Sequence, residues 1–154
     1  MQQNQKASIT GIGSYLPSKV LTNYDLEKMV DTSDDWIIQR TGIKERRIVE
    51  NGQITSDLAT YASLRAMEDA GVSPGDLDMI ITSTITPDHI FPSTSCYIQQ
   101  KIGASRASAF DILAACAGFI YALSVGESFV NSGAMKTVLV VGAECLSKIT
   151  DYTD

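Results

Sequence analysis

The sequence predicts an α/β fold in which a parallel-stranded sheet carries helices on both faces. Short apolar runs alternate along the chain with helix-like segments that end in glycine. The run Val138–Val141 is apolar and rich in β-branched residues, as is typical of a central parallel strand covered on both sides. Apolar residues make up 44% and charged residues 19% of the 154, which excludes a disordered chain.

Local signals place the first elements. Ser8–Ser14 is predicted to be a strand that ends in a glycine-rich turn. Thr22–Asp25 and Thr32–Asp35 each have the pattern of a capping box. We therefore expect two short helices in succession, the second ending near Gly42. The mixed charges of Lys44–Arg47 predict a solvated turn.

The rest of the chain alternates regularly. The predicted helices are Ser56–Ala70, Ser93–Gly103 and Cys116–Asn131, and the predicted strands are 78–84, 107–113 and 137–142. Alanines recur at three- and four-residue spacing in the first of these helices, a stripe suited to close packing on a sheet. No closing helix or strand follows Val138–Val141, so we expect a sheet that is not complete within this sequence.

Cys116 is the strongest candidate catalytic residue, because it lies where a predicted buried strand turns directly into a helix. Backbone N–H groups and the helix dipole at a helix N-terminus favour the thiolate, which is the nucleophilic form. The alanines and Gly118 around it leave the sulfur unshielded. A small buried cysteine that fills a gap between sheet and helix is the alternative.

A second candidate site combines Thr32, Trp36 and Arg40, which are spaced four residues apart and are predicted to share one stripe of a short helix. Indole and guanidinium planes one turn apart can hold a flat heteroaromatic ring, and the arginine can also reach a phosphate. The alternative is that Trp36, the single tryptophan, anchors the helix on the core while Arg40 forms a surface ion pair.

Composition excludes several classes of function. A net charge of −6 argues against nucleic acid as a partner, and no apolar run is long enough to cross a bilayer. Three cysteines without metal-ligand spacing fit a reducing cytoplasm, and we assign Cys96 and Cys145 to packing. The single histidine, His89, excludes a histidine-rich metal site, and we expect it in a surface loop. Phe91, in the same loop, is a candidate for an interface or a pocket.

Five stretches of the sequence together closely resemble β-ketoacyl-[acyl-carrier-protein] synthase III, the condensing enzyme that starts bacterial type II fatty acid synthesis. They are Gly11–Pro17, Thr32–Ile37, Arg40–Arg46, Phe110–Phe119 and Val140–Glu144. The resemblance covers essentially the whole chain but only the first half of the family's length. It implies a thiolase-like fold, with a doubly wound mixed sheet and helices on both faces. This would be one half of a duplicated five-layered structure, and residues 1–154 would be one incomplete N-terminal domain.

The resemblance also implies the reaction. An acetyl or other short acyl group passes from acyl-CoA to the cysteine that matches Cys116. Malonyl-acyl carrier protein then loses CO2, and its carbanion attacks the thioester to give 3-oxoacyl-acyl carrier protein. Trp36 and Arg40 match the residues that hold the adenine end of CoA, with Thr32 beside them. Phe91 matches a residue at the dimer interface, near the partner's acyl pocket.

The resemblance implies a cytoplasmic homodimer that uses acyl-CoA as a substrate and has no tightly bound cofactor or metal. The family's catalytic His and Asn, and one of the two oxyanion-hole N–H groups, belong to the second half and have no match in this sequence. We therefore expect this acyltransferase chain to be inactive alone. Two alternatives stay open: a related thiolase-superfamily condensing enzyme of secondary metabolism, or a non-catalytic piece that acts only with its complementing half.

Overall fold

The structure is a computed structural model that describes residues 6–153. These residues form two compact units. The sheet unit comprises the described part of residues 1–15 together with residues 54–144, and the hairpin unit comprises residues 16–53 and the described part of 145–154. The predicted domain 1–154 also includes residues 1–5 and 154, which lie outside the described residues.

Three parallel strands in the order β4–β3–β5 form the centre of the sheet unit. They are β3 (Met79–Ser83), β4 (Ser108–Ile112) and β5 (Val138–Gly142). Every residue of β3 is buried, because a helix layer covers each face and a strand lies on each side. All three strands agree with the predicted ranges to within one residue at each end.

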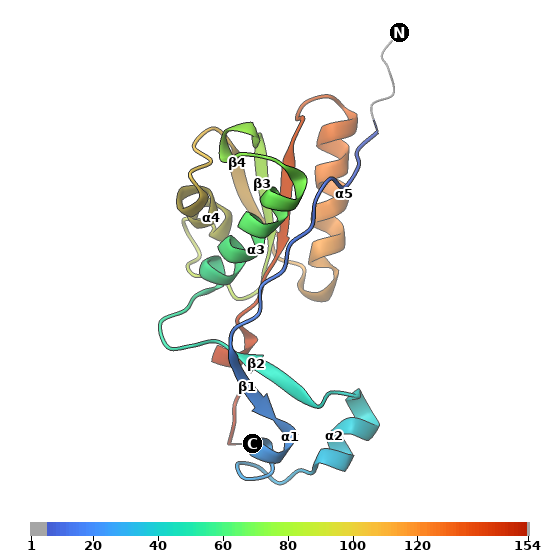
Figure 1. Cartoon of the computed structure of the whole chain (residues 1–154), viewed down its shortest axis with the longest axis vertical. Coiled ribbons are helices and arrows are strands. Elements are labelled where there is room, and N and C mark those ends of the chain that lie inside the picture. The colour runs from blue at the N-terminus through green and yellow to red at the C-terminus, as the bar shows by residue number, and fades with distance from the viewer. Residues whose placement is uncertain (1–5, 154) are drawn as a thin grey trace. The chain divides into compact units, whose positions relative to one another are not determined.

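Helices cover both faces of this sheet, as Figure 1 shows. Side chains alternate between the faces of a strand, so Met79 and Ile81 pack in the layer of α5 (Gly118–Asn131), whereas Ile80 packs on the opposite face. That opposite layer also contains residues of α3 (Thr55–Ala70) and α4 (Thr94–Ile102). The predicted doubly wound arrangement is therefore confirmed.

Caps explain where these helices begin and end. Helix α4 begins after Ser93, whose Oγ accepts the Cys96 N–H, and ends at Gly103 with a positive φ of 77°, as predicted. Helix α3 begins at Thr55 rather than Ser56. Its cap comes from the Asp57 carboxylate, which accepts the N–H of Ile54 at 3.0 Å.

The predicted first strand, Ser8–Ser14, is wrong: this segment is extended but forms no ladder. Its backbone lies directly on the alanine stripe of α3, since a side chain at Gly11 or Gly13 would overlap Ala66. The N–H of Ile12 donates to the Asp69 carboxylate at 2.9 Å. The stripe thus packs against this segment.

The sheet has an unpaired edge within the described part of the chain. Among the described strands, β5 pairs with β3 alone. A cavity of about 660 Å³ borders β5 and is lined as well by Ile9, Gly11, Ile12 and Gly13. The expectation of a sheet that is not complete within this sequence stays a prediction, because an open sheet also ends in edge strands.

The hairpin unit pairs β1 (Lys19–Thr22) with β2 (Glu45–Ile48) in antiparallel register. Two short helices connect them, α1 (Asn23–Leu26) and α2 (Asp34–Thr41). The predicted solvated turn at Lys44–Arg47 is wrong. Alternate side chains of β2 point to opposite faces of the hairpin, and one of these faces is exposed. Charged side chains are therefore compatible with a strand here.

Three one-turn 3-10 helices complete the described elements: η1 (Pro74–Asp76), η2 (Ala115–Ala117) and η3 (Leu146–Lys148). In the part of the chain that the structure describes, no helix is both long and apolar enough to cross a membrane.

Candidate active site

Cys116 lies in the one-turn helix η2, between the end of β4 and the start of α5, and it is exposed. The predicted strand-to-helix junction is confirmed, although α5 itself begins at Gly118 rather than at Cys116. Exposure contradicts the alternative that Cys116 is a buried filler. The thiol is therefore open to a reactant.

The backbone at this junction is strained. Ala115 has a φ of 46°, and it is the one positive φ of a non-glycine residue among the described residues. Such conformations carry a cost for any residue with a Cβ, and they persist where the surrounding structure enforces them. Close by in the chain, Gly118 is buried so tightly against Ser83 that an added Cβ would overlap the serine hydroxyl.

The junction belongs to the carboxyl edge of the parallel sheet. Ser83, Ile112 and Gly142 end their strands in the same register. Loops at this edge of a parallel sheet carry the functional groups of most α/β proteins. Cys116 is thus in the part of the fold where a catalytic residue is expected.

Glu144 holds the neighbouring loop in place, a role that the sequence reasoning did not assign. Its carboxylate accepts the N–H groups of Ile85 at 2.9 Å and Thr86 at 3.1 Å, and the Thr84 hydroxyl at 3.2 Å. These bonds join the loop after β3 to the loop after β5. An acidic residue two positions after the end of an apolar strand was the available signal.

Asp111 is a second residue that sequence reasoning missed. It lies in β4, and its two carboxylate oxygens accept the N–H groups of Thr94 at 2.6 Å and Ser95 at 2.8 Å. A negative charge at a helix N-terminus is favourable, so Asp111 positions α4 against the sheet. A charged residue inside an otherwise apolar strand was the signal.

The loop between β3 and α4 contains both His89 and Phe91. His89 is exposed, as predicted, and its ring centroid lies 5.6 Å from that of Tyr97. Phe91 is 88% exposed and Ile90 is fully exposed. Adjacent large apolar side chains in water are unusual enough to indicate a contact surface.

The two remaining cysteines differ from Cys116 in exposure. Cys145 is buried, which agrees with a packing role. Cys96 is partly buried and its sulfur accepts the Ser93 hydroxyl at 3.2 Å. Among the described residues, no group of three or more His, Cys, Asp and Glu side chains is arranged to hold a metal ion.

The predicted Trp36–Arg40 pair is present on α2. The central guanidinium carbon of Arg40 lies 4.2 Å from the Trp36 ring centroid. Trp36 is 52% exposed, whereas Ile37 is the buried residue of this helix. The alternative that Trp36 anchors α2 on the core is therefore wrong.

Thr32 does not share the helical stripe. Ser33 is the N-cap of α2 and its hydroxyl accepts the Trp36 N–H at 3.1 Å, so Thr32 precedes the helix. The predicted capping box at Thr32–Asp35 thus begins one residue too early. The box at Thr22–Asp25 is confirmed, since each of these two side chains accepts the other's backbone N–H.

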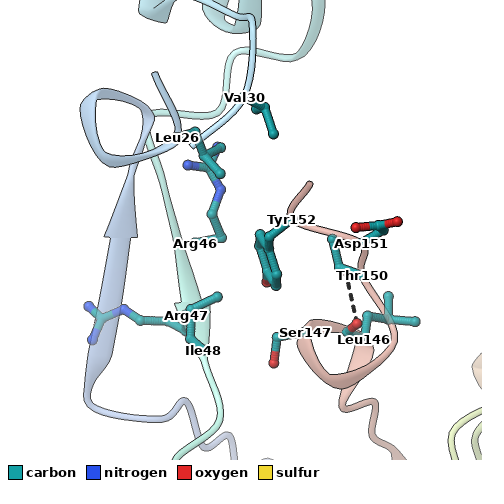
Figure 2. Close-up of a pocket in the computed structure, with 10 residues that line it drawn as sticks. All are labelled: Leu26, Val30, Arg46, Arg47, Ile48, Leu146, Ser147, Thr150, Asp151 and Tyr152. Carbon is teal, nitrogen blue, oxygen red and sulfur yellow. Dashed lines mark hydrogen bonds between the residues drawn. The ribbon is translucent and has the colours of Figure 1, made fainter. Parts of the chain in front are cut away.

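Figure 2 shows a pocket of about 410 Å³ within the hairpin unit. Both apolar and polar residues line it, namely Leu26, Val30, Arg46, Arg47, Ile48, Leu146, Ser147, Thr150, Asp151 and Tyr152. The Thr150 hydroxyl donates to the carbonyl of Leu146 at 2.9 Å, the bond drawn in the figure. Neither Trp36 nor Arg40 lines this pocket, so it is distinct from the predicted adenine site.

Comparisons with known proteins agree with this geometry. Residues 110–154 match the family model of 3-oxoacyl-[acyl-carrier-protein] synthase III. A β-ketoacyl-[acyl-carrier-protein] synthase III of Caldanaerobacter subterraneus subsp. tengcongensis is 62% identical over 148 residues, which are 96% of this chain and 45% of that protein.

The chain belongs to the β-ketoacyl-[acyl-carrier-protein] synthase III family.

Solved structures of the family confirm the thiolase-like fold. The 3-oxoacyl-[acyl-carrier-protein] synthase III from Aquifex aeolicus VF5 superposes with a TM-score of 0.92 at 55% identity, covering 95% of this chain and 47% of that one. The priming β-ketosynthase of the R1128 polyketide pathway superposes with a TM-score of 0.93 at 36% identity, covering 100% and 47%. The chain thus spans about half the length of the synthase III relatives it matches, consistent with their N-terminal half.

Proposed function

We propose that this chain provides the acyl-accepting thiol and the adenine-binding residues of a β-ketoacyl-[acyl-carrier-protein] synthase III. One observation carries the proposal: Cys116 is exposed in a strained turn at the carboxyl edge of a parallel sheet. That turn lies within the residues that match the family model. Nucleophiles are placed in this way when the backbone must present them to a substrate.

The reaction proceeds in two steps. The Cys116 thiolate attacks the thioester carbonyl of a short acyl-CoA, forming a new S–C bond while the CoA thiolate leaves with its electron pair. Malonyl-acyl carrier protein then loses CO2, and the electron pair of the broken C–C bond attacks the acyl-cysteine carbonyl. The Cys116 thiolate is released together with 3-oxoacyl-acyl carrier protein. No electron is gained or lost overall, so the cycle needs no redox cofactor.

The CoA nucleotide is proposed to bind at α2. The exposed face of Trp36 and the guanidinium of Arg40 present two planar surfaces suited to an adenine ring. Thr32, just before the helix, is proposed to lie beside the bound nucleotide. Phe91, with its nearly complete exposure, is proposed to contact a second copy of the protein in a homodimer.

The remaining proposals concern the whole protein. Residues 1–154 are proposed to form an incomplete N-terminal domain whose partner half supplies the His and Asn that stabilise the developing enolate oxygen. The complete enzyme is proposed to act in the cytoplasm without a tightly bound cofactor. The net charge of −6 favours small-molecule and protein partners over nucleic acid.

A related condensing enzyme of secondary metabolism is the second candidate. It is favoured by one observation, the superposition with the R1128 priming β-ketosynthase over the whole chain. The two candidates differ in the acyl-CoA and in the carrier protein that they use. Competition between acetyl-CoA and longer acyl-CoA substrates, each with fatty-acid or polyketide carrier protein, separates them.

Acylation of Cys116 tests the proposed function. The chain, alone and combined with the second half of the Caldanaerobacter relative, is incubated with acetyl-CoA, and peptides are mapped by mass spectrometry. We expect one acetyl group on the Cys116 peptide, none in C116A, and 3-oxoacyl product only in the combined sample. Acetylation of Cys96 or Cys145 instead, or product formation by C116A, would falsify the assignment.

A further inference from the structure

We propose that Asn23 is a positioning residue for the acyl-CoA site, because its side-chain amide holds the helix that carries Trp36 and Arg40. The inference rests on the proposed function of that pair. Asn23 opens α1 and is fully buried, with 0% exposure. A buried amide without partners is costly, so a fully buried asparagine calls for a complete set of hydrogen bonds.

Every hydrogen-bonding group of the Asn23 amide has a protein partner. Its Nδ2 donates to the Asp34 carboxylate and to the Ile43 carbonyl, both at 2.8 Å. Its Oδ1 accepts from the Arg46 guanidinium at 2.6 Å. The backbone N–H of Asn23 also donates to the Lys44 carbonyl at 3.2 Å. The geometry uses both amide hydrogens and the amide oxygen.

Two of these partners lie at the two ends of α2. Asp34 is its first residue, and Ile43 follows Gly42, the left-handed residue that ends it. One amide therefore bonds both the first residue of the helix and the chain just after it. A second bond supports the N-terminal end of α2, since the Asp34 N–H donates to the Glu27 carboxylate at 2.7 Å.

Helix α2 needs these bonds because it has little apolar packing of its own. It is eight residues long and buries only Ile37. Helices of this length are marginal in water without tertiary contacts. Its orientation, and hence the place of Trp36 and Arg40, depends on polar anchors at its two ends.

Arg46 connects the same amide to the hairpin. Its guanidinium donates to the Leu21 carbonyl at 3.1 Å as well as to Asn23. Figure 2 shows this side chain extending from β2 alongside Leu26 of α1. Asn23 thus joins α2 to α1 and to both strands of the hairpin.

Asparagine is the residue type that this position requires. An aspartate of the same shape still accepts from Arg46, but it has no hydrogen to donate to Ile43 or Asp34. Its carboxylate also faces that of Asp34. N23D therefore breaks the bonds to α2 while it keeps the bond to the hairpin.

The test uses this chain combined with the second half of the Caldanaerobacter relative. Three variants of the chain are compared with the unmodified one: N23D, the double variant N23D/D34N and the control S147A. In the double variant the amide introduced at position 34 donates to the carboxylate introduced at position 23, which restores one bond in the reverse direction. Ser147 accepts the Val49 N–H at 3.3 Å in the same unit, so S147A removes a bond that does not touch α2. The measurements are KM for acetyl-CoA and for malonyl-acyl carrier protein, and fluorine NMR of fluorotryptophan at position 36, assigned with W36F.

We expect N23D to raise KM for acetyl-CoA roughly ten-fold, as loss of buried bonds to α2 suggests, with KM for malonyl-acyl carrier protein unchanged. The Trp36 resonance should shift before any ligand is added, and N23D/D34N should recover part of both effects. S147A should change neither. If N23D does not fold, recovery of folding by N23D/D34N, with acetyl-CoA KM still raised, supports the proposal.

Three results would overturn it. The first is an unmoved Trp36 resonance with unchanged KM in N23D. The second is an equal loss toward both substrates, which indicates a general structural role. The third is a shifted resonance with unchanged KM for acetyl-CoA, provided that W36A itself raises that KM. If W36A has no effect, the proposed nucleotide site fails, whereas the shifted resonance still shows that Asn23 holds α2.

Discussion

The guanidinium of Arg40 lies over the face of the Trp36 ring, with its central carbon 4.2 Å from the ring centroid. The two residues are one helical turn apart on α2, and both are exposed. A cation over an exposed indole contributes about 0.5–1 kcal/mol, which holds the pair in a defined arrangement. No planar ring fits between groups this close, so a stacked ligand must displace the guanidinium or use another exposed part of the indole.

The first prediction follows from this pair. W36A should raise KM for acyl-CoA roughly ten-fold, since a stacked base is worth about 1–3 kcal/mol. KM for malonyl-acyl carrier protein should stay unchanged, because stacking serves the adenine. Steady-state kinetics of the chain combined with the second half of the Caldanaerobacter relative, with each substrate varied in turn, measures both KM values. The control is Y24A, which removes an exposed aromatic ring from α1 in the same unit. Equal losses toward both substrates would indicate a structural role for Trp36.

The second prediction concerns the three thiols. Cys116 is exposed, Cys96 is partly buried and Cys145 is buried, so iodoacetamide should alkylate them in that order. Peptide mapping over a time course measures the three rates. C116S should abolish condensation, because a serine hydroxyl without an adjacent base is a far weaker nucleophile. Faster labelling of Cys96 than of Cys116 would count against the assignment.

The third prediction concerns the contact between the N-terminal segment and α3. A Cβ at Gly13 would overlap the backbone of Ala62 and Ala66, which cannot move aside without distorting the helix. G13A should therefore lower the free energy of unfolding by about 1–3 kcal/mol. Urea denaturation measures the change. G75A is the matched control, because the nearest atom to its new Cβ would be the Ser73 Oγ at 3.9 Å. Equal stability of the two variants would show that Gly13 does not lie on α3.

The fourth prediction concerns pH. The N–H of Thr137, with that of Lys136, donates to the Asp78 carboxylate and holds its pKa below the ordinary value of 3.8. A folded-state pKa that is depressed gives stability above the unfolded-state value, and this stability is lost as the pH falls through the folded-state value.

D78N should accordingly be less stable than the unmodified chain at neutral pH, by about 1 kcal/mol. The difference should shrink once the pH falls below 3.8. Urea denaturation over an acidic pH series measures it, with D31N, an exposed carboxylate on the α1–α2 connection, as the control. A difference that stays constant as the pH falls would show that the Asp78 charge does not contribute to stability.

Short-range signals in the sequence predicted several elements correctly. The residues Ser93 and Gly103 bound α4 as expected, because a capping hydroxyl and a left-handed glycine act within one turn. Trp36 and Arg40 could be paired for the same reason, since residues four apart on a helix are neighbours. The strand-to-helix junction at Cys116 was predicted because an apolar run directly precedes a helix-forming run.

Signals that depend on distant partners failed. Ser8–Ser14 has the composition of a strand, but its Ile12 N–H is bonded to Asp69 of α3 rather than to a neighbouring strand. Lys44–Arg47 has the charge of a solvated turn, but Arg46 is bonded to Leu21 and Asn23 across the hairpin. In both cases the backbone conformation depends on residues far away in the sequence.

The sequence by itself determined the order of helices and strands from α3 to β5, the candidate nucleophile Cys116 and the Trp36–Arg40 pair. Only the tertiary structure decided the roles of Asn23, Asp111 and Glu144, whose hydrogen-bond partners lie on other elements. The physical reason is that propensity, capping and apolar periodicity act over a few residues. A buried amide or carboxylate, by contrast, acquires its role from the groups that folding brings within about 3 Å of it.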